Sequence, residues 1–287
     1  MKKFSFLFIL IGLIVLMTGC SENENTQVLA TTKPVYQFTT SLCSGTPVQV
    51  DLLVSENVSC LHEYTLQVSQ MRKLESAELI VINGAGFEDF LGDILHNRRN
   101  ILDCSVNIEL HCDDSHSHDG HEHQHDPHIW LRVDNARIMA QNIYIGLCQT
   151  YPEYAGTFSQ NLQVLNEKFL ALDEMIQSLS VLSCRDLITF HNGFTYLAED
   201  CNLHIVRAIE EESGSEASAQ ELISIIAEIS EHNIPAIFTE ASSTSTAAEV
   251  IHAETGVAVF ELDMGLSQRS YFEAMEHNIK TLKEALE

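Results

Sequence analysis

Basic side chains are scarce in this sequence, which holds 15 Lys and Arg residues against 41 Asp and Glu residues. The formal net charge at pH 7 is therefore −26. A surface this acidic repels a phosphate backbone, which excludes nucleic acid as a partner. The same surface attracts cations, although salt screens that attraction beyond about 10 Å.

Paired cysteine motifs are absent as well. None of the eight cysteines stands in a C-x-x-C pair, so cysteines do not outline a structural zinc site. We interpret most of them as small buried residues. The candidate disulfide joins Cys184 to Cys201. The sequence leaves open how the cysteines other than Cys20 pair. An odd number of them remains, so at least one thiol is free or intermolecular. They are Cys43, Cys60, Cys104, Cys112, Cys148, Cys184 and Cys201.

A run long enough to span a membrane is also absent from the start of the chain. The apolar run Phe4–Met17 follows two lysines and is too short for an ordinary span, a pattern typical of a secretory signal. Its end, Leu16-Met17-Thr18-Gly19-Cys20, resembles the bacterial lipobox. We expect a signal peptide over residues 1–19, lipidation of Cys20 and a polar tether over 20–27, which anchor the protein on the extracytoplasmic face of the cell membrane. A plain cleaved signal is the alternative.

Short apolar, β-branched runs alternate with longer helical patterns along most of the chain. The strand candidates are Val28–Thr32, Val48–Val54, Leu79–Asn83, Leu187–Phe190, Ile234–Thr239 and Val257–Leu262. The helix candidates include Tyr64–Ser76, Gln220–His232 and Thr246–Thr255. This alternation is typical of α/β proteins with parallel sheets. Because it occurs twice, we predict two similar lobes, residues 28–150 and 184–287, each a parallel sheet flanked by helices.

The segment between the two lobes has a different pattern. Apolar residues recur at spacings of three and four, at Phe158, Leu162, Leu165, Phe169, Leu172, Met175 and Ile176. Pro152 stands where a helix would begin, and neither Gly nor Pro occurs from residue 157 to 182. The pattern predicts one amphipathic helix of about seven turns. We expect one long rigid helix over residues 151–183 to join the lobes; a helix packed on a single larger domain is the alternative.

Seven of the fourteen histidines fall between His111 and His128. This run has no apolar periodicity, and Gly120 and Pro127 interrupt it, so we expect a disordered loop over residues 111–126. We predict weak, auxiliary metal binding by the loop histidines His111, His116, His118, His121, His123 and His125. The alternative is a solvated segment without a role.

One stretch of the loop, His121 to His125, matches the zinc-protease pattern H-E-x-x-H. That mechanism needs a helix, which places the two histidines on one face with the Glu beside the metal-bound water. Here the five residues lie in a polar run just before Pro127. In a segment so rich in His and Glu a chance match is expected, so a zinc hydrolase using His121, Glu122 and His125 is the less favoured interpretation.

Four other residues lie at boundaries between strand and helix. His62 follows the strand Val48–Val54, His128 follows the loop, His191 follows Leu187–Phe190, and Asp263 follows Val257–Leu262. In doubly wound sheets, ligands bind beyond the carboxyl ends of the strands. This placement predicts a four-coordinate site between the lobes, to which each lobe contributes two ligands. Taken singly, each histidine is more often a helix-capping or core residue than a metal ligand.

The order of the motifs carries a more specific resemblance. The motifs are Cys60-Leu61-His62-Glu63-Tyr64, Asn83-Gly84-Ala85-Gly86-Phe87-Glu88, Asp126-Pro127-His128-Ile129-Trp130-Leu131, Thr189-Phe190-His191-Asn192-Gly193-Phe194, Ile237-Phe238-Thr239-Glu240 and Phe260-Glu261-Leu262-Asp263. Behind a lipobox, this series resembles the cluster A-I metal-binding receptors of bacterial ABC importers, the zinc/manganese solute-binding lipoproteins. The resemblance covers nearly the whole mature chain and implies two α/β lobes spanned by a rigid helix.

The resemblance also implies a ligand set, which is His62, His128, His191 and Asp263. Glu240 is a candidate hydrogen-bond acceptor for a ligand histidine, and an exposed or helix-capping Glu is the alternative. The chain departs from the family where Leu61, Ala241 and Met264 replace the usual Pro. These changes put the rigidity of the loops in doubt more than the identity of the ligands.

Three imidazoles and one carboxylate suit Zn²⁺, whereas Mn²⁺ prefers more oxygen ligands. Manganese-binding members of the family tend to carry a carboxylate where His191 stands. We therefore predict a monomeric high-affinity zinc receptor, not an enzyme, that delivers Zn²⁺ to an ABC permease and its ATPase. A manganese receptor of the same family, or a metal-binding adhesin or buffer, remains the alternative.

Overall fold

The computed structural model describes residues 27–54, 64–111, 125–210, 217–241 and 245–287. The predicted signal peptide, Cys20 and most of the tether lie outside these residues, as do His62 and most of the His-rich loop. Within the described ranges, no helix combines the length and the apolar character that a membrane crossing requires.

The first sheet contains four parallel strands in the order β2-β1-β3-β4. The strands are β1 (Val28–Ala30), β2 (Val50–Leu52), β3 (Leu79–Ile82) and β4 (Ile101–Asp103). Val28 pairs with Val50 on one side and with Leu79 on the other. Because β1 is covered on both edges and both faces, all three of its residues are apolar and buried.

The second sheet repeats this arrangement in the order β6-β5-β7-β8, again with parallel pairing. Its strands are β5 (Asp186–His191), β6 (His204–Glu210), β7 (Ala236–Glu240) and β8 (Ala258–Leu262). The strand β5 is central, and its last five residues are buried. Two parallel sheets with helices around them confirm the predicted fold class.

Nine α-helices in the described residues cover the sheets. They are α2 (Lys33–Cys43), α3 (Val68–Ser76), α4 (Asp93–His96), α5 (Val133–Thr150), α6 (Ala155–Gln177), α7 (Thr195–Asp200), α8 (Ala219–His232), α9 (Thr246–Thr255) and α10 (Tyr271–Leu286). Ser218 and Ser270 cap α8 and α10, and in each case a Glu three residues later completes a capping box. These reciprocal hydrogen bonds explain why the two helices begin where they do.

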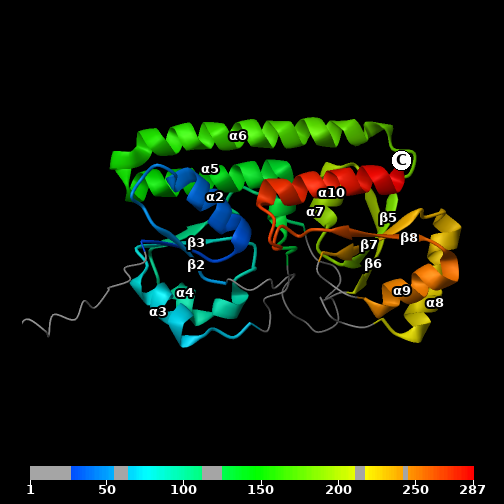
Figure 1. The fold of residues 1–287 in the computed structure, drawn as a ribbon. Helices are drawn as coiled ribbons and strands as arrows, with labels where there is room; N and C mark the ends of the chain where they lie inside the picture. Colours follow the sequence, from blue (N-terminus) through cyan, green and yellow to red (C-terminus); the bar gives the residue numbers. More distant parts are fainter. Residues whose placement is uncertain (1–26, 55–63, 112–124, 211–216, 242–244) are drawn as a thin grey trace, which may run out of the picture.

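The long helix α6 runs along both lobes and packs on α2 and α5 at one end and α10 at the other (Figure 1). Its buried residues are Phe158, Leu162, Leu165, Phe169 and Leu172, five of the seven periodic positions in the sequence. Short 3-10 turns, Pro152–Tyr154 and Ser178–Val181, extend it at the two ends. One continuous apolar core includes residues of both sheets and this helix, so the lobes are packed together along α6.

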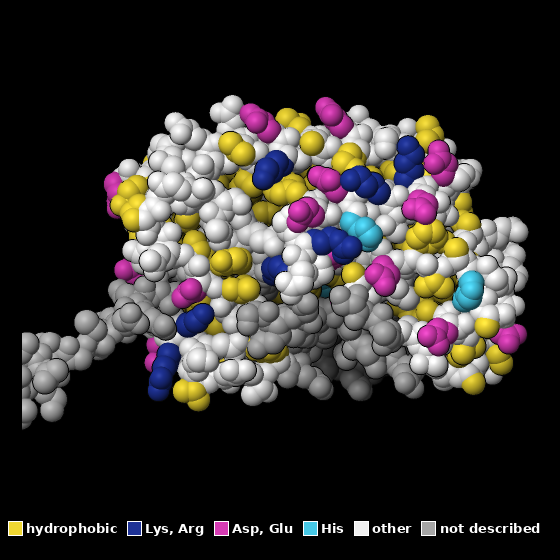
Figure 2. All heavy atoms as spheres, viewed as in Figure 1, with side chains coloured by type: hydrophobic (Ala, Val, Ile, Leu, Met, Phe, Trp, Pro, Cys, Tyr) yellow, Lys and Arg dark blue, Asp and Glu magenta, His cyan; other side chains and the backbone are white. Residues whose placement is uncertain are grey.

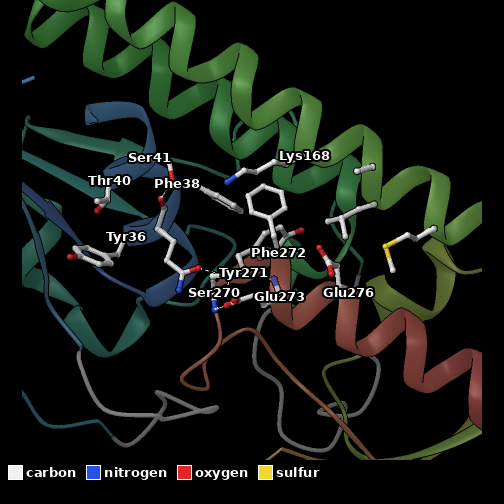
Figure 3. A pocket seen from close by; sticks show the side chains of 14 residues that line it. Tyr36, Phe38, Thr40, Ser41, Lys168, Ser270, Tyr271, Phe272, Glu273 and Glu276 are labelled. Carbon is white, nitrogen blue, oxygen red and sulfur yellow. Dashed lines mark hydrogen bonds between the residues drawn. The ribbon is translucent and has the colours of Figure 1, made fainter. Parts of the chain in front are cut away.

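A cavity of about 550 Å³ lies at the junction of the two lobes, between α2, α6 and α10 (Figure 3). Phe38 of α2 and Phe272 of α10 line it, and Lys168 of α6 lies over the Phe272 ring at 5.2 Å. Of the predicted metal ligands that the structure describes, His128, His191 and Asp263, none lines this cavity. The face around it carries interspersed acidic, basic and apolar side chains (Figure 2).

Some local predictions are wrong. The helix expected from Tyr64 begins only at Val68, and the predicted strands do not include β4 or β6. The candidate disulfide is not formed, because Cys184 and Cys201 are both free thiols. The Cys184 thiol instead donates to the carbonyl of Asp186 at 3.4 Å, and Cys201 is buried after α7. Burial raises the pKa of Cys201 to about 12, so this thiol stays protonated.

Candidate metal site

Two of the predicted ligands, His128 and His191, meet between the lobes. His191 is the last residue of the buried strand β5, and His128 directly precedes the 3-10 turn Ile129–Leu131. Both side chains are nearly buried, and their Nε2 atoms lie 3.5 Å apart. Two nitrogen ligands about 2.0–2.1 Å from a tetrahedral zinc ion lie roughly 3.4 Å from each other. The pair is therefore spaced as two ligands of one such ion would be.

A carboxylate fixes the orientation of His128. Asp126 Oδ1 lies 2.8 Å from His128 Nδ1 and also accepts from the backbone N–H of His128 at 2.9 Å. Burial by itself would raise the pKa of Asp126, but its hydrogen bonds and ion pair with His128 outweigh burial, and the pKa is lowered. A charged Asp126 holds the proton of His128 on Nδ1, which leaves the Nε2 lone pair free for a cation. The sequence hypothesis gave Asp126 no role, although the D-x-H spacing was visible.

His191 is held by packing instead. Its pKa is lowered to about 3, mainly by burial and then by the charge of His128, so the imidazole is neutral and can donate a lone pair. The Nδ1 atom is buried and has no hydrogen-bond partner among the described residues. A Cβ atom on Gly193 would lie 2.7 Å from both the His191 ring and Met264 Cε. Gly193 is therefore required for the ring to occupy this place.

Aromatic rings pack around the first-lobe side of the pair. The ring of His128 lies 5.4 Å from that of Trp130 and 6.1 Å from that of Phe87, all in edge-to-face contact. Trp130 is fully buried, and its indole N–H donates to the carbonyl of Met264 in the second lobe at 2.7 Å. This bond brings the end of β8 next to His128.

The loop after β3 supports the same region. The Asn83 side chain donates to the carbonyl of Pro127 at 3.0 Å, directly before His128. Glu88 lies beneath this loop and accepts from the backbone N–H groups of Asn83 and Gly84 at 2.7 and 3.0 Å, and from the Thr31 hydroxyl. Burial raises the pKa of Glu88 to about 7. From the sequence, Asn83 and Glu88 had no predicted role beyond their place in the family motif.

Asp263 lies at the end of β8, and its side chain is 1% exposed. Its carboxylate contacts residues of its own loop: Gly265 N–H donates to Oδ1 at 2.8 Å, and the Ser267 hydroxyl and Arg269 Nη1 donate to Oδ2. In the described part of the chain, no three His, Cys, Asp or Glu side chains are arranged to hold a metal ion. The structure thus brings together two of the four predicted ligands. Among the described residues, Asp263 is linked to them only through its neighbour Met264, whose carbonyl accepts from the Trp130 indole. His62 lies outside the described residues.

The structure describes only some of the remaining predicted residues. His111 Nε2 lies 3.0 Å from a carboxylate oxygen of Glu199 in α7, and its ring packs on Tyr196. His125 is exposed, and the other loop histidines lie outside the described residues, as does most of the H-E-x-x-H match. Glu240 ends β7, the strand beside β5, and is partly buried. Its contact with a ligand histidine stays a prediction.

Two parallel-sheet lobes joined by one long helix, with buried imidazoles meeting between them, define the class of two-lobed solute-binding proteins. Within that class, the chain belongs to the family of the periplasmic zinc-uptake complex component A, ZnuA, whose model matches residues 28–285. This family is a receptor component of a transport system, so the prediction that the chain is not an enzyme is confirmed.

Individual relatives agree with the family assignment. The chain is 27% identical to the zinc-binding lipoprotein AdcA of Streptococcus pneumoniae, over 99% of its own length but only 61% of that of AdcA. Among solved structures, it is 27% identical to ZnuA, with a TM-score of 0.79 over 91% of this chain and 100% of the other. A zinc-bound deletion mutant of ZnuA aligns with a TM-score of 0.76 over 91% of this chain and 98% of the mutant, also at 27% identity.

Proposed function

We propose that this protein is an extracytoplasmic zinc receptor that delivers Zn²⁺ to an ABC permease and its ATPase. The single observation that carries the proposal is the 3.5 Å approach of His128 Nε2 to His191 Nε2 from the two lobes. Membership in the zinc-uptake family supports the same cargo. The proposed ligand set is His62, His128, His191 and Asp263, with residues 28–150 and 184–287 each contributing two ligands.

The surroundings of the histidines fit binding and release rather than catalysis. A catalytic zinc ion needs an open coordination position for water or substrate, whereas four protein ligands fill a tetrahedral shell. Both imidazoles are nearly buried, and burial keeps His191 neutral. Since neutral imidazoles are the form that binds metal, the cargo should bind at neutral pH and compete with protons in acid.

The choice of zinc over manganese rests on the donor atoms. Three imidazole nitrogens and one carboxylate match the borderline-soft, four-coordinate Zn²⁺ ion, whereas Mn²⁺ favours more oxygen ligands. A His191→Glu variant should therefore shift the preference toward Mn²⁺. An unchanged competition between the two metals would contradict this assignment.

The attachment and the accessory loop are further parts of the proposal. Residues 1–19 would direct export, and the lipid on Cys20 would hold a monomeric receptor near its permease through the tether 20–27. The His-rich loop, residues 111–126, would collect zinc weakly beside the tight site. Deletion of residues 116–125 should then lower the total zinc bound and keep one tight site. Loss of the tight site would mean that the loop itself is the receptor.

Metal analysis with competitive titration tests the proposal. The purified protein should retain one zinc ion against a chelator, and His191→Ala should weaken zinc binding by about 100-fold or more, because a direct ligand is lost. His204→Ala is the matched control, since this histidine lies in the same lobe and its side chain is 70% exposed. Equal affinities of the two variants would contradict the proposed site.

A further inference from the structure

The carboxylate of Asp263 has few acceptor positions left for a cation. A carboxylate offers about four lone-pair positions, two on each oxygen. On Oδ2, one is used by the Ser267 hydroxyl at 2.5 Å and the other by Arg269 Nη1 at 3.1 Å. On Oδ1, the backbone N–H of Gly265 uses one at 2.8 Å. A single lone pair, on Oδ1, therefore remains for a metal ion.

The two groups on Oδ2 are themselves oriented. The Ser267 hydroxyl oxygen accepts from the backbone N–H of Arg269 at 3.1 Å, so its own proton is directed at Asp263. Arg269 pairs with Asp263, whose side chain is 1% exposed, although the Arg269 side chain as a whole is 43% exposed. A bond between a charged donor and a buried carboxylate is among the stronger hydrogen bonds in proteins.

The backbone beneath the carboxylate is fixed as well. The N–H of Asp263 donates to the side-chain oxygen of Asn278 at 2.7 Å, and the side-chain nitrogen of Asn278 donates to the carbonyl of Asp263 at 2.8 Å. Asn278 belongs to α10 and is fully buried. With both its backbone and Oδ2 held, the carboxylate cannot turn its second oxygen toward a cation without breaking these bonds.

The number of available oxygens bears on which metal is bound. One oxygen and three imidazoles give the four-coordinate shell of Zn²⁺, while Mn²⁺ gains from each additional oxygen ligand. We propose that Arg269 and Ser267 are specificity-determining residues, which occupy Oδ2 of Asp263, restrict it to one metal–oxygen bond and so favour Zn²⁺ over Mn²⁺. This inference rests on the proposed function, because it assumes that Asp263 binds the cargo.

Arg269 could instead act only through its positive charge, which would repel any metal ion. A variant of Lys33 distinguishes this charge effect from the blocking of Oδ2. Lys33 begins α2, its positive charge acts on Asp263, and its Nζ donates to the carbonyl of Leu266 at 3.5 Å. A Lys33→Gln variant thus removes a nearby positive charge without freeing Oδ2. If charge alone mattered, Lys33→Gln and Arg269→Gln would both strengthen zinc and manganese binding alike.

The experiment measures the ratio of the Kd for Mn²⁺ to the Kd for Zn²⁺, by chelator competition at one pH. In the Arg269→Gln/Ser267→Ala variant the ratio should fall by about tenfold or more, because manganese gains an oxygen ligand, with smaller falls in the single variants. Arg269→Lys, which restores a charged donor, should return the ratio toward that of the wild type. Lys33→Gln should leave the ratio unchanged.

An unchanged ratio in the double variant would overturn the inference, whether the two affinities stay as they were or rise by the same factor. If the double variant fails to fold, the Ser267→Ala variant still decides, because it removes one neutral hydrogen bond from Oδ2. X-ray absorption of the manganese-loaded variants should show more oxygen neighbours than in the wild type. Should the wild type lack a tight zinc site, or His191→Ala leave it intact, the proposed function itself would fail. A tight, His191-dependent site with an unmoved ratio would overturn only the role of Arg269 and Ser267.

Discussion

The two imidazoles at the centre of the site are held in different ways. In the first lobe, the Asp126 carboxylate fixes His128 through a 2.8 Å hydrogen bond. In the second lobe, His191 has a buried Nδ1 without a partner among the described residues and depends on the space left by Gly193. The comparison shows that a ligand histidine can be oriented either by a charged partner or by close packing. Zinc affinity should therefore be sensitive to loss of charge beside His128 in the first lobe, and to added side-chain volume beside His191 in the second.

The largest expected effect comes from added volume in the second lobe. In Gly193→Ala, the new methyl group would lie 2.7 Å from the His191 ring, so the ring must move and zinc affinity should fall by about 100-fold. Gly156→Ala is the matched control, because nothing lies within 4 Å of its added Cβ. Isothermal titration or chelator competition measures both variants. If Gly193→Ala bound zinc like the wild type, packing would not be what holds His191.

A loss of charge in the first lobe should come next in size. Asp126→Asn keeps the shape but removes the carboxylate that holds the proton of His128 on Nδ1, which should lower zinc affinity by about 10–100-fold. Glu240→Gln is the corresponding change beside His191 and tests the predicted role of Glu240. Competition titrations of the two variants sharpen the comparison. Equal, unchanged affinities would show that neither imidazole relies on a charged partner.

The buried Glu88 beneath the first-lobe loop should respond to pH. Its folded pKa of about 7 lies above the ordinary value of 4.5, so the folded state holds the proton longer than the unfolded state. Its contribution to stability is complete below about pH 4.5 and is lost as the pH rises through about 7. Glu88→Gln removes this pH-dependent loss. The free energy of unfolding of the variant, relative to that of the wild type, should therefore rise by up to about 3 kcal/mol between about pH 4.5 and 7.

Urea unfolding of the metal-free wild type and Glu88→Gln at several pH values measures that difference. The amide also changes the local hydrogen bonds, which shifts the free energy of unfolding by an amount that does not depend on pH. The test is therefore how the difference between the variant and the wild type changes with pH, and not its absolute size. A difference that stays constant between pH 4.5 and 7 would contradict a raised pKa for Glu88. Thr31→Val, which removes the hydroxyl donor to this carboxylate, should raise its pKa further.

The smallest expected effect lies at the junction between the two halves. The Tyr271 hydroxyl of α10 donates to the carbonyl of Trp130 at 3.0 Å, and both residues are buried. Tyr271→Phe should lower the free energy of unfolding by about 1 kcal/mol and leave zinc affinity within a few-fold of the wild type. Thermal unfolding measures the first quantity. A large loss of zinc affinity would instead show that this bond sets the position of His128 relative to His191.

The architecture was largely predictable from the sequence, because buried strands and the periodic face of α6 are visible in the order of apolar residues. The strand β4 was missed because its apolar run is limited to Ile101 and Leu102, whereas the runs around β1 and β2 are longer. The strand β6 was missed because His204 and Arg207 interrupt its apolar run. The rule that ligands bind beyond the carboxyl ends of parallel strands placed His191, which ends β5. His128 follows the loop and not a strand, so its approach to His191 came from the proposed four-ligand set.

The supporting residues were harder to predict. Asp126 bonds to His128, and Arg269 bonds to Asp263. Both contacts depend on side-chain geometry within loops, which the spacing of residues in the sequence does not define. The requirement for Gly193 arises only once Met264 and His191 are packed against it. The position of His62 relative to the pair stays a prediction.

Anomalous diffraction at the zinc edge from zinc-loaded crystals tests the central claim most directly. We expect one strong peak between the lobes, about 2.0–2.1 Å from Nε2 of both His128 and His191. A peak that contacts only one of these histidines, or strong peaks confined to the His-rich loop, would contradict it.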